Sequence, residues 1–178
     1  KDKKSFILTS FKKRGLIKVY LTIYCIKLAL FLLDMLTLAG LLHDCAKEYS
    51  EEQLRAMCKD YQGSDKTLHA VCAPIVAQKK YGIEDTEILS SIRWHTTGKA
   101  NMALLDKIIF VADFIEPCRK MITILPEIRR IAFEDLTYAV FRISEETIPY
   151  LKMMDYPMDN NTVECYEWLK ENGIHDRQ

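Results

Sequence analysis

Glycine and proline, the residues that most often interrupt regular structure, are scarce in this chain. Only 6 glycines and 5 prolines occur among its 178 residues, and no low-complexity stretch marks a linker. Apolar residues recur at helical spacing nearly throughout, whereas the alternation typical of strands has little support. A chain of this length can build one domain with a substantial core but is short for two. We therefore expect an all-α protein with one structural domain.

Local signals predict where several helices begin and end. The Ser-Glu-Glu-Gln sequence at 50–53 is a capping box, and Asp85 can cap a later helix. Between them, Lys66–Tyr81 is expected to be helical and to end at Gly82, with Pro74 either kinking the helix or starting a new one. Further helices are expected over 102–116, 126–151 and 162–172, with a polar turn over 155–161.

The stretch from Gly15 to Leu42 is strongly apolar and raises the question of a membrane helix. Lys18, Lys27 and Asp34 divide it into charge-free runs of eight residues or fewer. A membrane span needs roughly 20 apolar residues, and no small-residue cleavage site follows the stretch. We therefore expect burial against other helices, and neither a transmembrane helix nor a signal peptide.

The overall charge and the cysteines narrow the class of protein. Acidic and basic residues balance at 25 each, so no overall field would recruit nucleic acid or an anionic membrane. Any phosphate binding must come from a local site. The six cysteines show neither a Cys-x-x-Cys pair nor the spacing of a disulfide framework. We expect reduced thiols in a cytoplasmic protein.

Two aspartates lie in apolar surroundings, where burial of a charged side chain costs free energy. Asp44 follows His43 at the end of an apolar run, and Asp113 interrupts the most apolar helix expected in the chain. A carboxylate that is buried in such a place needs a cation or several donors. Each of the other two histidines also has an ordinary interpretation. His69 can be a satisfied core or surface histidine. His95 can be a histidine at a helix C-terminus that interacts with the last carbonyls.

Taken together, these five residues suggest a metal site. Imidazoles combined with carboxylates suit divalent metals such as iron, manganese or zinc. The separations are 26 residues from His43 to His69, 26 from there to His95, and 18 from there to Asp113. Such spacing fits one ligand on each successive helix of a bundle. Two metals bridged by one carboxylate would generate a hydroxide nucleophile and neutralise phosphate charge.

The motifs around these residues resemble the HD superfamily of metal-dependent phosphohydrolases. The matching sequences are Ala-Gly-Leu-Leu-His-Asp-Cys-Ala-Lys at 39–47, Leu-His-Ala at 68–70, His-Thr-Thr-Gly at 95–98 and Ala-Asp-Phe-Ile-Glu-Pro-Cys-Arg at 112–119. They are similar to the branch of symmetrical bis(5'-nucleosyl)-tetraphosphatases, from about Ala39 to the C-terminus. The resemblance implies an HD-type helical bundle that cleaves diadenosine tetraphosphate into two ADP. It also implies a dinuclear centre with iron as the expected metal, although manganese or another divalent metal stays open.

The resemblance also assigns roles to the ligands. Asp44 would bridge the two metals. His69 and His95 would complete one metal site. His43 and Asp113 would serve the other.

The same mapping predicts contacts to the substrate. Lys47 and Arg119 would hold phosphate oxygens and, with Asp44, form the expected catalytic set. The expected nucleotide contacts are Asp44, Lys47, His95, Thr96, Thr97, Asp113, Arg119, Tyr156, Asn160 and Asn161, the last three from the family's C-terminal loop. The chain would comprise a divergent helical segment over 1–38, the phosphohydrolase core over 39–151, and a loop with a short helix over 152–178.

One ligand of the family has no counterpart here. The family carries a further histidine on its first helix, before the His-Asp pair, but no histidine precedes His43 in this chain. The metal at His43, Asp44 and Asp113 would therefore lose one protein ligand, which commonly weakens affinity. Two explanations stay open. Either the region has diverged and left a weakened or single-metal enzyme, or it is a misread or frame-shifted gene segment.

Other functional interpretations also stay open. One is an HD phosphohydrolase that acts on a nucleoside monophosphate or a cyclic nucleotide. Another, suggested by the absent histidine, is a catalytically impaired nucleotide-binding module. The expected partner is a small-molecule nucleotide, with no nucleic acid and no membrane. A homodimer through the apolar N-terminal stretch is compatible with the sequence.

Overall fold

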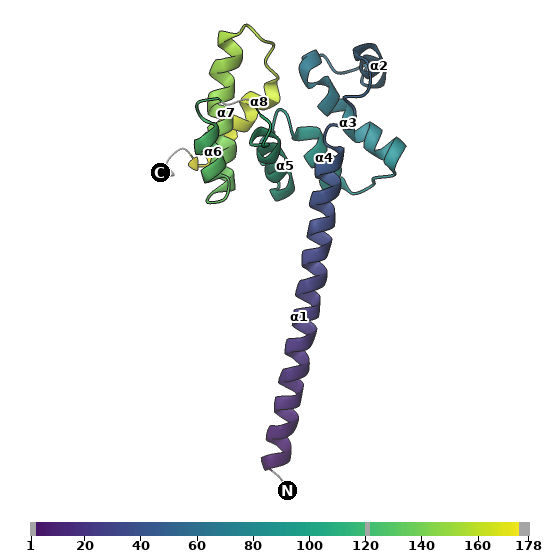
Figure 1. Ribbon diagram of the computed structural model, residues 1–178, viewed down its shortest axis with the longest axis vertical. Coiled ribbons are helices and arrows are strands. Elements are labelled where there is room, and N and C mark those ends of the chain that lie inside the picture. Colours follow the sequence, from purple (N-terminus) through teal and green to yellow (C-terminus); the bar gives the residue numbers. More distant parts are fainter. Residues whose placement is uncertain (1–2, 120–121, 175–178) are drawn as a thin grey trace. The chain divides into compact units, whose positions relative to one another are not determined.

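The computed structural model describes residues 3–119 and 122–174, with side chains described from Tyr20 onward. These residues form helices joined by turns, with no strand among them (Figure 1). The chain divides into two compact units, residues 1–37 and 38–178. The predicted all-α fold is confirmed.

Helix α1 (Lys3–Leu42) begins in the first unit and ends in the second. Its side chains from Tyr20 to Asp34 are exposed, including Tyr24 at 68% and Leu33 at 58%. The expected burial of this stretch is therefore wrong for Tyr20–Asp34, whereas Met35, Ala39 and Leu42 farther along the helix are buried. Apolar residues surround the helix instead of forming one stripe, so no single packing face can cover them.

The same part of α1 meets the length and composition of a membrane span. The 23 residues Tyr20–Leu42 are long and apolar enough to cross a bilayer. The interrupting charges therefore do not by themselves exclude a span. The absence of a membrane partner stays a prediction.

The last turn of α1, which belongs to the second unit, buries its apolar side chains on one face. Ala39 and Leu42 are buried, together with Ala46 in the turn that follows. Their spacing places them on one face, as for a helix end that packs on a core. This packing fixes the position of His43 and Asp44.

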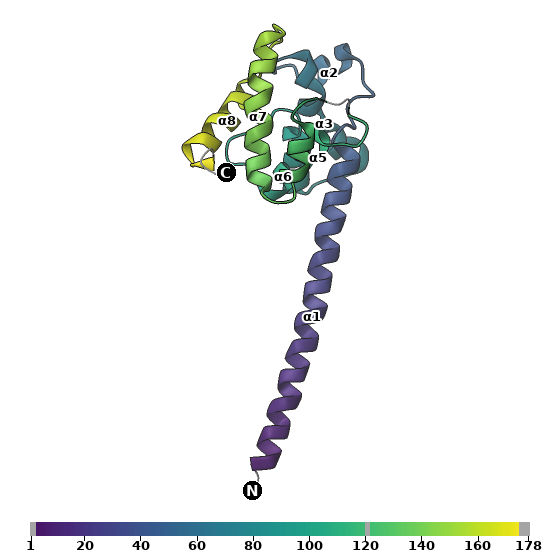
Figure 2. The same ribbon diagram turned by 60° about the vertical axis from the view of Figure 1, so that its left-hand side comes forward.

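Seven more helices follow within the described residues. They are α2 (Glu51–Met57), α3 (Asp65–Tyr81), α4 (Thr86–Trp94), α5 (Leu104–Phe114), α6 (Leu125–Ile131), α7 (Leu136–Met153) and α8 (Asn160–Glu171). Successive contacts join α3 to α4, α4 to α5, α5 to α7 and α7 to α8, while α2 packs on α3 and α6 on α7 (Figures 1 and 2). Phe110, Ile128, Val140 and Leu169 form part of one core where α5 to α8 meet.

Several predicted helix ends are confirmed. Ser50 accepts a hydrogen bond from the Gln53 backbone N–H, and the Gln53 side chain accepts one from the Ser50 backbone. Asp85 accepts hydrogen bonds from two backbone N–H groups of α4. Gly82 ends α3 in the left-handed conformation, at φ 68°. Helix α3 continues through Pro74, so the proline does not start a new helix.

Two predicted elements differ from the structure. The single helix expected over 126–151 is two helices, because Asp135 caps the start of α7 by accepting the Tyr138 N–H. The polar turn expected over 155–161 is shorter. Asp159 accepts the Asn161 N–H, so α8 already begins at Asn160.

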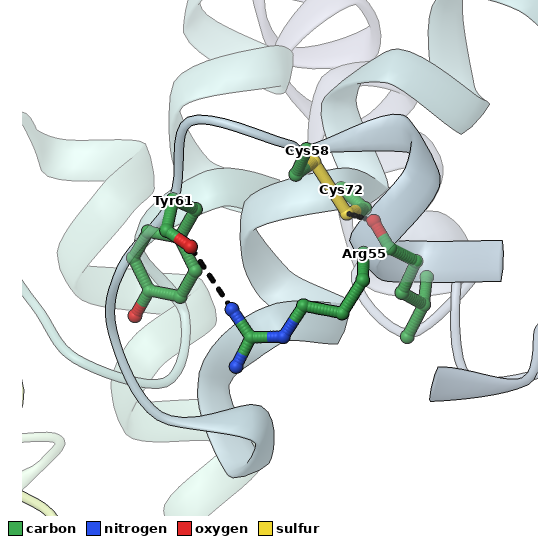
Figure 3. Close-up of a disulfide and its surroundings, with 5 residues drawn as sticks. Arg55, Cys58, Tyr61 and Cys72 are labelled. Carbon is green, nitrogen blue, oxygen red and sulfur yellow. Dashed lines mark hydrogen bonds between the residues drawn. A yellow bond between two sulfur atoms is a disulfide. The ribbon is translucent and has the colours of Figure 1, made fainter. Parts of the chain in front are cut away.

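The cysteines include one pair that the sequence did not reveal. Cys58 and Cys72 form a disulfide with their Cα atoms 6.2 Å apart (Figure 3). The expectation of reduced thiols is therefore wrong for this pair, whose separation of 14 residues matches no common motif. The bond joins the end of α2 to α3, and Arg55 nearby donates to the Tyr61 carbonyl at 2.9 Å.

Candidate metal centre

Five side chains from successive elements of the second unit converge on one point. His43 and Asp44 follow α1, His69 lies on α3, His95 follows α4, and Asp113 lies on α5. The Nε2 atoms of His69 and His95 lie 3.6 and 3.3 Å from Asp44 Oδ1. His43 Nε2 lies 3.3 Å from Asp44 Oδ2 and 3.7 Å from Asp113 Oδ1. The atoms thus form two groups of possible ligands that share Asp44.

Backbone carbonyls fix two of the imidazole rings. His43 Nδ1 lies 2.7 Å from the Gly40 oxygen, and His95 Nδ1 lies 2.7 Å from the Ile92 oxygen. A carbonyl only accepts hydrogen bonds, so each Nδ1 must carry a proton. The carbonyls near a helix end are free for this role because they lack helical partners. In a neutral ring, Nε2 then offers its lone pair to the cluster, as a metal ligand does.

The Oδ1 atom of Asp44 is the strongest sign of a cation. It is buried and has no hydrogen-bond partner, although it faces the Nε2 atoms of His69 and His95. Oxygen and nitrogen lone pairs at this distance repel one another unless a proton or a cation lies between them. Two imidazoles and a carboxylate are donors that suit a divalent transition metal. These residues therefore fit a metal ion.

The cluster strongly shifts the pKa values of its members. The nearby carboxylates of Asp113 and then of Asp44 raise the pKa of His43 to about 10. Burial, followed by repulsion from His95, lowers the pKa of His69 to about 4. Burial alone would raise the pKa of Asp44, but the neighbouring His43 and His95 rings outweigh burial and lower it. At neutral pH, His69 is thus already an uncharged ligand, whereas a metal must displace a proton from His43.

Both predicted phosphate-binding cations lie beside the cluster. Lys47 Nζ is 2.6 Å from Asp44 Oδ2. Arg119 Nη2 donates to the Asp113 backbone oxygen at 2.9 Å and lies 3.6 Å from Asp113 Oδ2. The Nε atom of Arg119 is buried and has no partner. Arg119 also lines the cavity, where its guanidinium can donate hydrogen bonds to a phosphate.

The two predicted threonines also lie beside the cluster. Thr96 Oγ1 lies 3.4 Å from His69 Nε2. The hydroxyl of Thr97 is buried and donates to the Gly98 carbonyl at 2.9 Å. Both residues line a cavity beside His95.

The three residues expected from the C-terminal loop lie elsewhere. Tyr156 packs under Lys66, whose Nζ is 3.1 Å from the ring centre. Asn161 donates to Asp159, and Asn160 is exposed in the first turn of α8. None of the three lines the cavity. Their role as nucleotide contacts stays a prediction.

The cavity beside the cluster has a volume of about 560 Å³. It is walled mainly by α5, by residues 122–124 and by α7. The residues of α7 that line it are Ile143, Ser144, Glu146, Thr147, Tyr150 and Leu151. Sequence analysis missed this wall, and the only available signal was the one-sided apolar pattern of α7.

The most buried carboxylate of the second unit was also missed. Asp106 on α5 is 1% exposed, and its Oδ2 lies 3.0 Å from Lys99 Nζ. The same oxygen accepts the Ala103 N–H at 3.0 Å. The pair ties the turn after His95 to α5, and so helps to hold that ligand. Asp113, which interrupts the most apolar helix expected from the sequence, is 31% exposed.

Comparison with known proteins agrees with this geometry. The HD domain family matches residues 17–117, more than half of the chain. The chain belongs to the HD-domain family. Among its HD-domain relatives is the symmetrical bis(5'-nucleosyl)-tetraphosphatase of Halalkalibacterium halodurans, 35% identical, with 74% of each chain covered. The enzyme of that name from Bacillus subtilis is 32% identical with the same coverage.

A solved HD-domain structure has the same fold. It is described as a predicted HD superfamily hydrolase involved in NAD metabolism, from Clostridium acetobutylicum. The TM-score is 0.69 at 36% identity, over 75% of each chain. The HD-type helical architecture predicted from the sequence is thus confirmed.

Proposed function

We propose that this protein is a metal-dependent hydrolase that cleaves dinucleoside tetraphosphates symmetrically, so that diadenosine tetraphosphate yields two ADP. One observation carries the proposal: the unpartnered Asp44 Oδ1 faces His69 and His95 beside a cavity large enough for a nucleotide. Relatives that bear the name of this activity are more than 30% identical over three quarters of the chain.

The chain's own residues account for binding and orientation. When bound, divalent metal ions supply Lewis-acid stabilisation of phosphate charge and lower the pKa of water. Arg119, which lines the cavity, would bind phosphate oxygens through its guanidinium. Lys47 would neutralise charge on the other side of Asp44. The Gly40 and Ile92 carbonyls keep His43 and His95 turned toward the centre.

We further infer a dinuclear centre in which Asp44 bridges two ions, with iron as the metal. The two groups of ligand atoms that share Asp44 support two positions, and the choice of iron rests on the family resemblance. The His43, Asp44 and Asp113 group lacks the family's additional histidine, because no histidine precedes His43. We therefore expect the group with His69 and His95 to hold its ion more tightly.

The test is to incubate the iron-loaded protein with diadenosine tetraphosphate under anaerobic conditions and to separate the products by chromatography. ADP as the sole product supports symmetrical cleavage. A mixture of ATP and AMP contradicts it. Metal content is measured on the same sample, and His69→Ala should remove more metal than His43→Ala. Asp60→Asn, which changes an exposed carboxylate outside the cluster, serves as the control.

The absent histidine favours one alternative, a nucleotide-binding module that has lost turnover. Such a module would bind ADP and hold no more than one ion per chain, without releasing product. Cleavage of a nucleoside monophosphate or a cyclic nucleotide, with no cleavage of the tetraphosphate, would instead indicate another substrate within the same family.

A further inference from the structure

The cavity beside the metal centre has a buried end and a solvent-facing edge. His95, Phe110 and Ser144 are at most 6% exposed. Two other lining residues, Glu146 and Tyr150 of α7, are about half exposed, at 52% for the Glu146 side chain and 51% for Tyr150. They lie four residues apart on one helix, so the carboxylate and the aromatic ring are neighbours.

Most hydroxyls along the α7 wall are already committed to the backbone. Ser144 donates to the Val140 carbonyl at 2.9 Å, and Thr147 donates to the Ile143 carbonyl at 2.7 Å. A hydroxyl whose proton is committed can only accept further hydrogen bonds. The α7 wall therefore offers acceptors to a ligand and few donors.

Glu146 is the strongest of these acceptors. Among the residues that the structure describes, its ionic partner is Arg142, at 3.6 Å. Arg142 is held more closely by Glu127, at 3.0 Å, and by Glu145. Arg142 is thus engaged by other carboxylates, and Glu146 keeps accepting capacity at the cavity edge. Asp113, the other carboxylate of the described lining, belongs to the metal cluster.

We propose that Glu146 is a specificity-determining residue that recognises the base of the bound nucleotide, with Tyr150 stacking on the ring. Guanine presents two adjacent donors, N1–H and the 2-amino group, which the two oxygens of one carboxylate can accept together. Adenine presents only its 6-amino group, and its N1 lone pair would face the second carboxylate oxygen. The cavity should therefore prefer guanine to adenine. This inference rests on the proposed function in one respect, that the cavity holds one nucleoside diphosphate half of the substrate.

The experiment compares GDP and ADP binding to the metal-loaded protein by calorimetry. We expect GDP to bind about tenfold more tightly, the effect of one additional hydrogen bond to a charged group. Glu146→Gln should bring the ratio close to one, because an amide offers one acceptor where the carboxylate offers two. Glu145→Gln is the matched control, since Glu145 also contacts Arg142 but does not line the cavity. It should keep the tenfold preference.

Tyr150→Leu separates stacking from base recognition. It should weaken GDP and ADP binding by a similar factor, because every base offers a face for stacking. Equal affinity of the wild-type protein for the two nucleotides would overturn the inference, as would a preference that survives in Glu146→Gln.

Failure of the proposed function would look different. If no dinucleoside tetraphosphate is cleaved but GDP binding still depends on Glu146, base recognition holds and the hydrolytic proposal fails. If both diadenosine and diguanosine tetraphosphates are cleaved with a ratio that Glu146→Gln leaves unchanged, only the base inference fails.

Discussion

The turn that follows His95 depends on a residue without a side chain. Gly98 has φ 67°, and a Cβ atom added there would lie 2.8 Å from the Sγ of Cys165 and 3.3 Å from its Cβ. Cys165 is buried on α8. The turn therefore approaches α8 this closely only because glycine occupies it, and the position of His95 depends on that approach.

Gly98→Ala should destabilise the protein more than Gly82→Ala does. Gly82 has nearly the same φ, 68°, but open space around its Cα. Gly82→Ala should cost about 1–2 kcal/mol, from the left-handed conformation alone. Gly98→Ala adds the clash with Cys165, and Cys165→Ala in the same chain should recover part of the loss. Urea unfolding measures all three, and equal losses at the two glycines would contradict this account.

The metal-ligand residues could be proposed from the sequence because their chemistry and local motifs are legible there. Asp44 and Asp113 interrupt apolar runs, and the histidines recur with regular spacing. The ion pair of Lys99 with Asp106 could not be predicted, because the burial of Asp106 depends on how α5 packs. Glu146 could not be predicted as a site residue either, because nothing in its local sequence distinguishes it from an ordinary exposed glutamate. Its position at the cavity follows from the packing of α7.

At the scale of elements, the start of α8 is attached to the loop before α3. Asp159 is buried, caps α8 by accepting the Asn161 N–H at 3.0 Å, and also accepts a hydrogen bond from the Tyr61 hydroxyl. The same hydroxyl lies 2.6 Å from Thr67 Oγ1 at the start of α3. One carboxylate thus joins two segments that are far apart in the sequence.

This attachment predicts a pH-dependent stability. Burial would raise the pKa of Asp159, but its hydrogen bonds with Tyr61 and Asn161 outweigh burial and lower it. The stabilisation is therefore present above the unfolded pKa, about 3.9, and is lost as the pH falls through the folded pKa. The difference in unfolding free energy between wild type and Asp159→Asn should shrink as the pH is lowered from 6 to 3. A difference that stays constant over this pH range would refute the prediction.

Helix boundaries were predictable where a side chain caps the backbone locally. Ser50 and Asp85 illustrate this, because their partners lie within three residues. The break before α7 was missed although Asp135 is also a cap, since apolar periodicity continues across it. The surroundings of α1 could not be deduced, because its composition fits both a buried helix and an exposed one.

At the scale of the whole molecule, the apolar part of α1 is a large unpaired surface. Its exposed side chains include Tyr24, Phe31 and Leu33, each more than half exposed. Contiguous apolar surface of this kind favours association with another protein or with lipid.

We expect the purified chain to elute as an oligomer without detergent and as a monomer in detergent micelles. Size-exclusion chromatography with light scattering measures this. Tyr24→Lys combined with Phe31→Lys should shift the protein toward monomer without detergent, because the two positions lie two turns apart on one side of the helix. Phe133→Lys changes another aromatic residue, 89% exposed on the second unit, and should leave the association unchanged. A wild-type monomer in plain buffer would exclude this behaviour.

Asp44 belongs to both groups of ligand atoms, so if each group held an ion, we would expect the two to influence one another. A cation held by one group would withdraw electron density from the shared carboxylate and restrict its rotamer, and so would change the ligand offered to the other group. Linkage requires that each ion change the affinity of its neighbour by the same factor. If two ions bind, a metal titration of this protein should fit only a binding model that includes a coupling constant between the two sites. The affinity measured for the second ion would then reflect the presence of the first.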